Sequence, residues 1–203
     1  MKYRTDVLVN GLILTGGNSA RMGTNKSDLD YHGIPHGEYL FSLLSEKTAE
    51  VYVSAAKGHK VSFTARVIKD ILEIKSPMNG IVSAFTFDPD SAWLVLAVDL
   101  PLITANTIEL LRSRRDPTKM ATCLTRKGAQ SPEPLVAIWE PKAFPVLKEY
   151  VASCNYSPKS LLLDHVIELV EVDDNAALFN ANEKDHYHQA KKMIESSYPK
   201  FNS

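Results

Sequence analysis

The chain has 203 residues, of which 44% are hydrophobic and 23% charged, a balance typical of a globular protein rather than a disordered or fibrous one. Lys and Arg number 23 and Asp and Glu 24, so the formal net charge of −1 gives no reason to expect a nucleic acid or an anionic membrane surface as partner. No apolar run approaches the roughly 20 residues of a membrane span, and Asp6 and Asn10 interrupt the N-terminal apolar stretch, which indicates a first strand rather than a signal peptide.

Short apolar, β-branched runs alternate along the chain with segments of helical periodicity. The expected strands are residues 11–15, 51–55, 66–69, 93–98, 121–124, 135–139 and 166–172. The expected helices are residues 38–49, 78–87, 105–114, 141–153, 158–163 and 184–197. This alternation predicts an α/β fold with a largely parallel sheet covered on both sides. The fifth and sixth strands have no helix between them, which makes them a candidate antiparallel pair in a mixed sheet.

The chain length and the absence of internal repeats predict one domain covering residues 1–203. Cys123 and Cys154 are the only cysteines and match no metal-binding or redox spacing, so a reducing, cytoplasmic setting is expected. His186 and His188 are two residues apart on a predicted helix and do not face each other, which argues against a metal site there.

The segment from Leu14 to Lys26, LTGGNSARMGTNK, is the most informative part of the sequence. Its glycines follow an apolar strand and allow backbone N–H groups to turn toward an anion, while the two cations Arg21 and Lys26 can neutralise phosphate oxygens. The spacing fits neither GxxxxGK[ST] nor GxGxxG. A flexible glycine-rich surface loop is the alternative, but open α/β sheets bind ligands at this end of their strands.

Asp99 lies at the end of a continuously apolar strand, in the sequence LAVDLP. A carboxylate at that place can hold Mg²⁺, which takes one or two carboxylates together with substrate phosphates. A turn cap ahead of Pro101 is the alternative reading. The cofactor expected from these residues is therefore Mg²⁺, with Asp99 as its ligand.

These segments together resemble the MobA-like nucleotidyltransferases, which include the molybdenum cofactor guanylyltransferases. The resemblance rests on six segments in order: LTGGNSARMGTNK, VIKD ending at Asp70, SPMNGI containing Gly80, DLP at Asp99, PEPLVAI, and FNANEKD containing Asn182. It implies a three-layer Rossmann-like nucleotidyltransferase fold with a mostly parallel, mixed central sheet. It also implies transfer of a nucleoside monophosphate from an NTP to a phosphorylated acceptor, with release of pyrophosphate.

The resemblance also assigns roles to residues. The nucleotide would contact or be positioned by Leu14, Thr15, Gly16, Gly17, Ser19, Lys26, Ser54, Asp70, Gly80 and Asp99. Arg21 and Lys26 would neutralise the triphosphate, and Asp99 would bind Mg²⁺. Asn180 and Asn182 would face the metal or the acceptor. The attacking group is then a phosphate oxygen of the acceptor, so catalysis needs positioning and charge neutralisation rather than an activated side chain.

Four positions depart from the family pattern. Asn25 replaces an Asp before the loop lysine, Ser54 an Asn, Ser76 a Gly, and Glu133 a His.

One further candidate comes from the residues alone: Ser157 and Pro158 start a helix, and Lys159 beside them can attract the acceptor's phosphate, although helix capping also explains the segment.

The leading hypothesis is a guanylyltransferase that joins GMP from GTP to molybdopterin or its molybdenum-loaded form, with transient contacts to other proteins of molybdenum cofactor biosynthesis. Guanine is preferred over cytosine because related cytidylyltransferases more often have LAAG where this chain has LTGG. The alternatives are transfer from CTP, transfer to another acceptor such as a sugar phosphate or adenosylcobinamide phosphate, and a non-catalytic nucleotide-binding or partner-docking module.

Overall fold

The computed structural model describes residues 7–16, 25–56 and 61–197. Its seven strands form one sheet in the order β3-β2-β1-β4-β6-β5-β7. The strands are β1 (Val9–Leu14), β2 (Val51–Ala55), β3 (Arg66–Lys69), β4 (Ala92–Ala97), β5 (Ala121–Thr125), β6 (Glu133–Trp139) and β7 (Glu168–Glu171). Strands β1 to β4 are parallel neighbours, β6 is antiparallel to both β4 and β5, and β7 is parallel to β5. The predicted mixed, mostly parallel sheet is therefore confirmed.

Six α-helices and two short 3-10 helices accompany the sheet within the described ranges. The α-helices are α1 (His36–Ser45), α2 (Pro77–Phe87), α3 (Ala105–Ser113), α4 (Ala143–Ala152), α5 (Pro158–Leu163) and α6 (Lys184–Ser197). The 3-10 helices η2 (Lys26–Asp28) and η3 (Asn175–Leu178) were not predicted, because three or four residues are too few for a periodic signal.

The helix starts follow the expected capping chemistry. Ser76 begins α2 by accepting the Met78 N–H at 3.2 Å, and Thr104 begins α3 by accepting the Thr107 N–H at 3.3 Å. Helix α1 ends at Ser45, earlier than its predicted end at residue 49, because the chain turns there: the N–H groups of Lys47 and Thr48 both donate to the Leu44 carbonyl.

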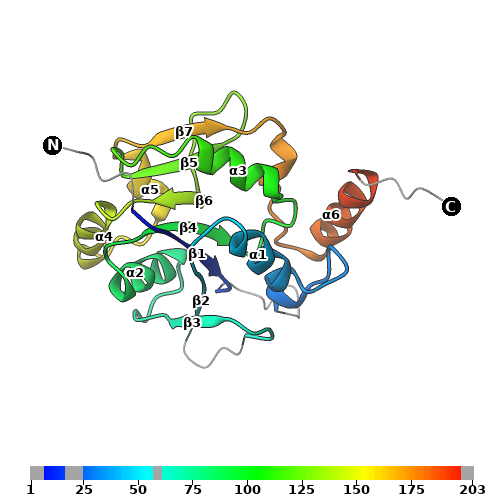
Figure 1. Cartoon of the computed structure of the whole chain (residues 1–203), viewed down its shortest axis with the longest axis horizontal. Coiled ribbons are helices and arrows are strands. Elements are labelled where there is room, and N and C mark those ends of the chain that lie inside the picture. The colour runs from blue at the N-terminus through cyan, green and yellow to red at the C-terminus, as the bar shows by residue number, and fades with distance from the viewer. Residues whose placement is uncertain (1–6, 17–24, 57–60, 198–203) are drawn as a thin grey trace.

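Helices cover both faces of the sheet, as Figure 1 shows: α2, α4 and α5 lie on one side and α1 and α3 on the other. Each face has its own core. Phe85, Trp93 and Trp139 are buried on the first, and Leu44, Leu94 and Ile108 on the second. The strand β4 is buried along its whole length, as a strand covered on both faces must be.

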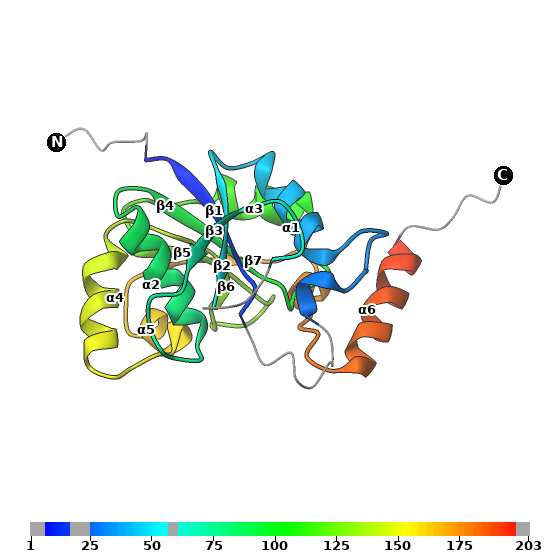
Figure 2. The same cartoon turned by 90° about the horizontal axis from the view of Figure 1, so that it is seen from below.

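Helix α6 stands apart from these two layers, beyond α1 (Figure 2). It packs in a smaller cluster in which Ala190 and Ala181 meet Tyr31, and the Tyr187 hydroxyl donates to the Asp30 carbonyl at 2.9 Å. This cluster brings the segment before α6 toward the chain that follows Lys26. Within the described ranges, no helix is long and apolar enough to cross a membrane.

Candidate functional site

The parallel strands β1 to β4 end at one edge of the sheet, where ligands of open α/β folds bind. The Val98 N–H donates to the Leu14 carbonyl at 3.3 Å, which joins the ends of β4 and β1. Beside it, the backbone N–H and the hydroxyl of Thr15 both donate to the Ser54 carbonyl, at 3.3 and 2.8 Å. The predicted residues Leu14, Thr15 and Gly16 therefore lie next to Ser54, and among the described residues nothing beyond its chain neighbours would contact a Cβ atom at Gly16.

Ser54 and Asp70 meet at this edge although they belong to different strands. The Ser54 hydroxyl donates to Asp70 Oδ1 at 2.5 Å. Gly80 of α2 packs directly against the same place: a Cβ atom there would lie 2.4 Å from Ser54 Oγ and 2.5 Å from Leu14 Cδ2. We call this group the Ser54 corner; its members are Leu14, Thr15, Ser54, Asp70 and Gly80.

Two further residues support the Ser54 corner. The sequence analysis did not assign this role to either of them. Asn79, only 3% exposed, accepts the Leu72 N–H at 2.9 Å and donates to the Leu72 carbonyl at 2.6 Å, which fixes the chain after Asp70. Ser76 donates to the Tyr156 carbonyl at 2.5 Å and so ties α2 to the start of α5. A polar Asn within an otherwise apolar helix start was the available signal for Asn79.

A second group forms around Asp99, beyond the end of β4. Asn180 Nδ2 donates to Asp99 Oδ2 at 3.0 Å, and the Ala181 N–H donates to the Asp99 carbonyl at 2.7 Å. Lys26 Nζ donates to Asn182 Oδ1 at 2.7 Å. We call Lys26, Asp99, Asn180 and Asn182 the Asp99 cluster. The segment 180–182 thus brings together the lysine and the carboxylate, which lie far apart in sequence.

The Asp99 cluster contains buried oxygen atoms without partners. Asp99 Oδ1 and Asn180 Oδ1 accept no hydrogen bond from the described residues, although both atoms are shielded from solvent. Burial lowers the pKa of Lys26, and the negative charge of Asp99 opposes this shift. Carboxylate and amide oxygens are hard ligands of the kind that Mg²⁺ prefers, so the donor set fits that ion. No group of three or more His, Cys, Asp and Glu in the described ranges could hold a metal, so substrate or amide oxygens would complete the coordination.

Glu133, at the start of β6, belongs to the same edge. Burial raises the pKa of Glu133, and the negative charge of Asp99 raises it further, while Lys159 and Arg126 act in the opposite direction. Glu133 therefore lies within electrostatic range of Asp99 and of the two cations. Lys159, predicted to attract an acceptor, is exposed on the first turn of α5.

Part of the predicted glycine-rich loop lies outside the described residues. Gly17, Ser19 and Arg21 are in this part. After it, Asn25 Oδ1 accepts the Ser27 N–H at 3.4 Å and caps η2, so the residue in place of the family's Asp still makes a local hydrogen bond.

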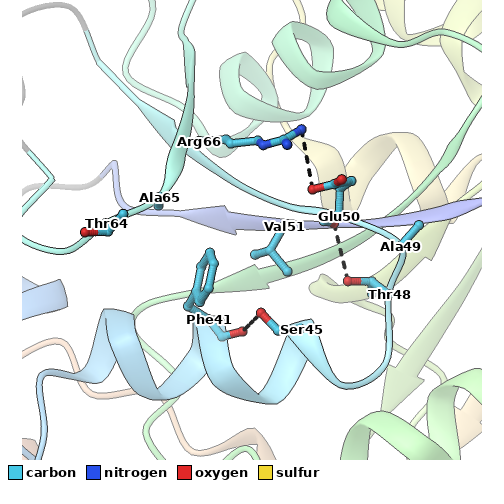
Figure 3. Close-up of a pocket in the computed structure, with 9 residues that line it drawn as sticks. All are labelled: Phe41, Ser45, Thr48, Ala49, Glu50, Val51, Thr64, Ala65 and Arg66. Carbon is cyan, nitrogen blue, oxygen red and sulfur yellow. Dashed lines mark hydrogen bonds and ion pairs between the residues drawn. The ribbon is translucent and has the colours of Figure 1, made fainter.

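Two hollows lie away from the site. The first, of about 360 Å³, is at the opposite end of β2 and β3, where Glu50 and Arg66 form an exposed ion pair at 3.4 Å (Figure 3). The second, of about 680 Å³, lies between α3, η3 and α6 and includes His32 and Tyr39 on its wall. Neither contains a residue of the Ser54 corner or the Asp99 cluster.

A mostly parallel α/β sheet that gathers a carboxylate and a lysine at the carboxyl ends of its parallel strands has the arrangement in which open α/β folds bind nucleotides. The family model described as the MobA-like NTP transferase domain matches residues 11–172. The chain therefore belongs to the MobA-like nucleotidyltransferase family, as its motifs predicted.

The chain is similar to several curated proteins. It is 26% identical over 175 residues to a probable molybdenum cofactor guanylyltransferase of Flavobacterium johnsoniae, covering 85% of this chain and 91% of that protein. It is 29% identical over 182 residues to a molybdenum cofactor biosynthesis bifunctional protein of Synechocystis, covering 88% of this chain but only 52% of that protein. This chain thus matches about half the length of the bifunctional relative.

Solved structures share the fold. A molybdopterin-guanine dinucleotide biosynthesis protein A from Archaeoglobus fulgidus superposes with a TM-score of 0.76 at 18% identity, covering 92% of this chain and 99% of that chain. A 2-C-methyl-D-erythritol 4-phosphate cytidylyltransferase from Thermus thermophilus gives a TM-score of 0.67 at 12% identity, covering 91% and 98%. These likenesses confirm the predicted Rossmann-like nucleotidyltransferase fold.

Proposed function

We propose that the protein transfers GMP from GTP to molybdopterin or its molybdenum-loaded form and releases pyrophosphate, as a single domain covering residues 1–203. One observation carries the proposal: segment 180–182 joins Lys26 and Asp99 in one cluster at the carboxyl ends of the parallel strands. The names of the curated relatives support guanine and the molybdopterin acceptor. The cysteine usage supports a cytoplasmic setting, where other proteins of molybdenum cofactor biosynthesis would deliver or receive the cofactor.

The Ser54 corner is the proposed nucleotide side. Backbone groups of Leu14, Thr15 and Gly16, continued by Gly17 and Ser19, would line the nucleotide. The side chains of Ser54 and Asp70 would meet its base or ribose, and their mutual hydrogen bond holds both in place. Gly80 permits this approach because a side chain there would displace Ser54.

The Asp99 cluster is the proposed centre of transfer. Lys26 and Arg21 would neutralise the triphosphate, while Asp99 would bind Mg²⁺ through its unpartnered oxygen, with the neighbouring Asn180 oxygen available to the same ion. Bound there, Mg²⁺ would neutralise charge on the phosphates. Asn182 would turn toward metal or acceptor, and the exposed Lys159 would attract the acceptor's phosphate.

The reaction needs no side-chain nucleophile. An oxygen of the acceptor's phosphate forms a bond to the α-phosphorus of GTP, and the bond from that phosphorus to the bridging oxygen of the β-phosphate breaks. The electron pair leaves with pyrophosphate. The chain contributes positioning and charge: Lys26 is held by Asn182 at 2.7 Å, so its ammonium group is oriented before the negative charge of the transition state develops.

Pyrophosphate release with GTP or CTP, each with and without molybdopterin and Mg²⁺, tests the proposal. We expect release only with GTP, acceptor and a divalent cation together. A strong preference for CTP would overturn the guanine assignment, and release with a sugar phosphate but not with molybdopterin would overturn the acceptor. Nucleotide binding without release under any condition would indicate a non-catalytic module.

A further inference from the structure

His32 connects the chain that follows Lys26 to the turn that carries Asp99. Its Nε2 atom lies 2.9 Å from the carbonyl oxygen of Pro101, 69 residues further along the chain. A carbonyl oxygen can only accept a hydrogen bond, so Nε2 carries the hydrogen and donates it. Pro101 is buried and follows Asp99 by two residues. The hydrogen bond from His32 therefore holds the backbone just beyond the proposed metal ligand.

The imidazole ring of His32 is itself held in place. It stacks on Tyr39 of α1, with ring centroids 3.7 Å apart and an angle of 16° between the planes. The Tyr39 hydroxyl donates to the Ile103 carbonyl at 3.0 Å, so the two stacked rings contact the same turn at two of its carbonyl groups. Burial lowers the pKa of His32, while the Pro101 carbonyl and Asp30 oppose this shift. A neutral imidazole has one N–H group, and the Pro101 carbonyl fixes it on Nε2.

The segment before α6 holds the same turn at Asp99. Asn180 Nδ2 donates to Asp99 Oδ2 at 3.0 Å, and the Ala181 N–H donates to the Asp99 carbonyl at 2.7 Å. The other carboxylate oxygen, Asp99 Oδ1, is buried and accepts no hydrogen bond from the described residues. The direction of this oxygen depends on the backbone of the turn, which Ala181 holds at residue 99 and His32 holds at Pro101.

We propose that His32 is a positioning residue for Asp99, whose carboxylate it keeps directed at the metal by fixing the Pro101 carbonyl. The catalytic part of this inference rests on the proposed function, in which Asp99 binds the divalent cation; the structural part does not. Loss of a group that orients a metal ligand typically lowers metal affinity or activity by roughly 10–100-fold. We expect a loss at the lower end of this range, because His32 acts through the backbone two residues from Asp99.

Two variants of equal length isolate the hydrogen bond from the ring. His32→Gln loses the ring but keeps an N–H donor of similar reach, and His32→Met loses both. We expect the kcat of pyrophosphate release from GTP to fall about tenfold in His32→Met and to stay within about threefold of the wild type in His32→Gln. The KM for GTP should stay within about twofold in both variants, because His32 makes no contact with the Ser54 corner among the described residues.

His165→Met is the matched control. It removes an exposed histidine whose Nδ1 lies 2.8 Å from the Leu161 carbonyl on α5, and it should keep the wild-type kcat. Equal kcat values in His32→Met and His32→Gln, wild-type kcat in His32→Met, or an equal loss in His165→Met would each overturn the inference. If His32→Met does not fold by circular dichroism, His32→Phe takes its place, because it keeps a ring to stack on Tyr39 and lacks the donor.

Hydrogen exchange of the Ala181 amide tests the positioning of Asp99 without the reaction, since this N–H donates to the Asp99 carbonyl. Measured by nuclear magnetic resonance on the full chain, the exchange should be about tenfold faster in His32→Met than in His32→Gln. Equal rates would show that the Pro101 contact does not hold Asp99, and would overturn the inference. If the wild type releases no pyrophosphate, the proposed function fails, while the exchange rates still decide whether His32 positions Asp99.

Discussion

A methyl group at Gly80 tests whether the Ser54 corner is as tightly packed as the structure shows. In Gly80→Ala the new Cβ would lie 2.4 Å from Ser54 Oγ and 2.5 Å from Leu14 Cδ2, whereas ordinary contacts begin at 3.4 Å. Both neighbours must move by up to about 1 Å, and they are fixed by the Asp70 hydrogen bond and by the buried end of β1.

Overpacking of this kind destabilises a fold by about 1–3 kcal/mol. The higher helix propensity of Ala offsets up to about 1 kcal/mol of that loss. We therefore expect the unfolding free energy of Gly80→Ala to fall by about 1–2 kcal/mol, which lowers the Tm by roughly 2–8 °C in a chain of this size.

Thermal unfolding followed by circular dichroism measures this shift. Gly16→Ala is the control for stability, because among the described residues no atom beyond its chain neighbours lies within 4 Å of the position its Cβ would take. A Tm of Gly80→Ala equal to or above that of the wild type would contradict the packing argument. It would show that the higher helix propensity of Ala outweighs the steric cost and that the Ser54 corner rearranges without a large loss of free energy.

Three further predictions concern other parts of the molecule. Glu140 is 1% exposed and accepts hydrogen bonds from Arg115 at 2.7 and 2.8 Å, so Arg115→Met leaves an uncompensated buried charge. Urea unfolding should show that the unfolding free energy falls by about 3–5 kcal/mol, and a fall of less than about 1 kcal/mol would contradict this. Burial lowers the pKa of His36 in the folded chain to about 3. Between about pH 6.5 and pH 3, His36 therefore binds a proton in the unfolded chain but not in the folded chain. The unfolding free energy should therefore fall as the pH falls from about 6.5 toward 3, by up to about 1.4 kcal/mol per unit, and His36→Phe should show a shallower slope in urea titrations at several pH values; an identical slope would refute the argument. Lys26→Met should reduce turnover about a hundredfold or more while the circular dichroism spectrum is kept, because the ammonium group held by Asn182 is lost; turnover within threefold of the wild type would remove Lys26 from the centre of transfer.

Sequence periodicity predicted the α/β layers well, because local signals agree with the tertiary environment. The apolar run of β4 is buried on both faces, and Ser76, Thr104 and Ser157 cap the helices that follow them. The candidate antiparallel pair of β5 and β6 is confirmed. The ends of α1 and the two 3-10 helices could not be predicted, since they depend on turns of a few residues.

The pairing of distant residues in the site could not be derived from local patterns. Motif spacing indicated Asp99 and Asn182 separately, but the hydrogen bond from Asn180 to Asp99 joins residues 81 apart and depends on where α6 packs. Glu133 stood out only as a departure from a pattern. Its place at the start of β6, beside β4, follows from β6 inserting between β4 and β5, which strand periodicity alone does not specify.

The most direct measurement of the central claim is the mass of the product formed from GTP and molybdopterin. The wild-type chain with Mg²⁺ should form a molybdopterin guanine dinucleotide, and Asp99→Asn should form at most traces of it while keeping its fold. Failure of the wild type to form this product from purified substrates, or undiminished formation by Asp99→Asn, would contradict the account.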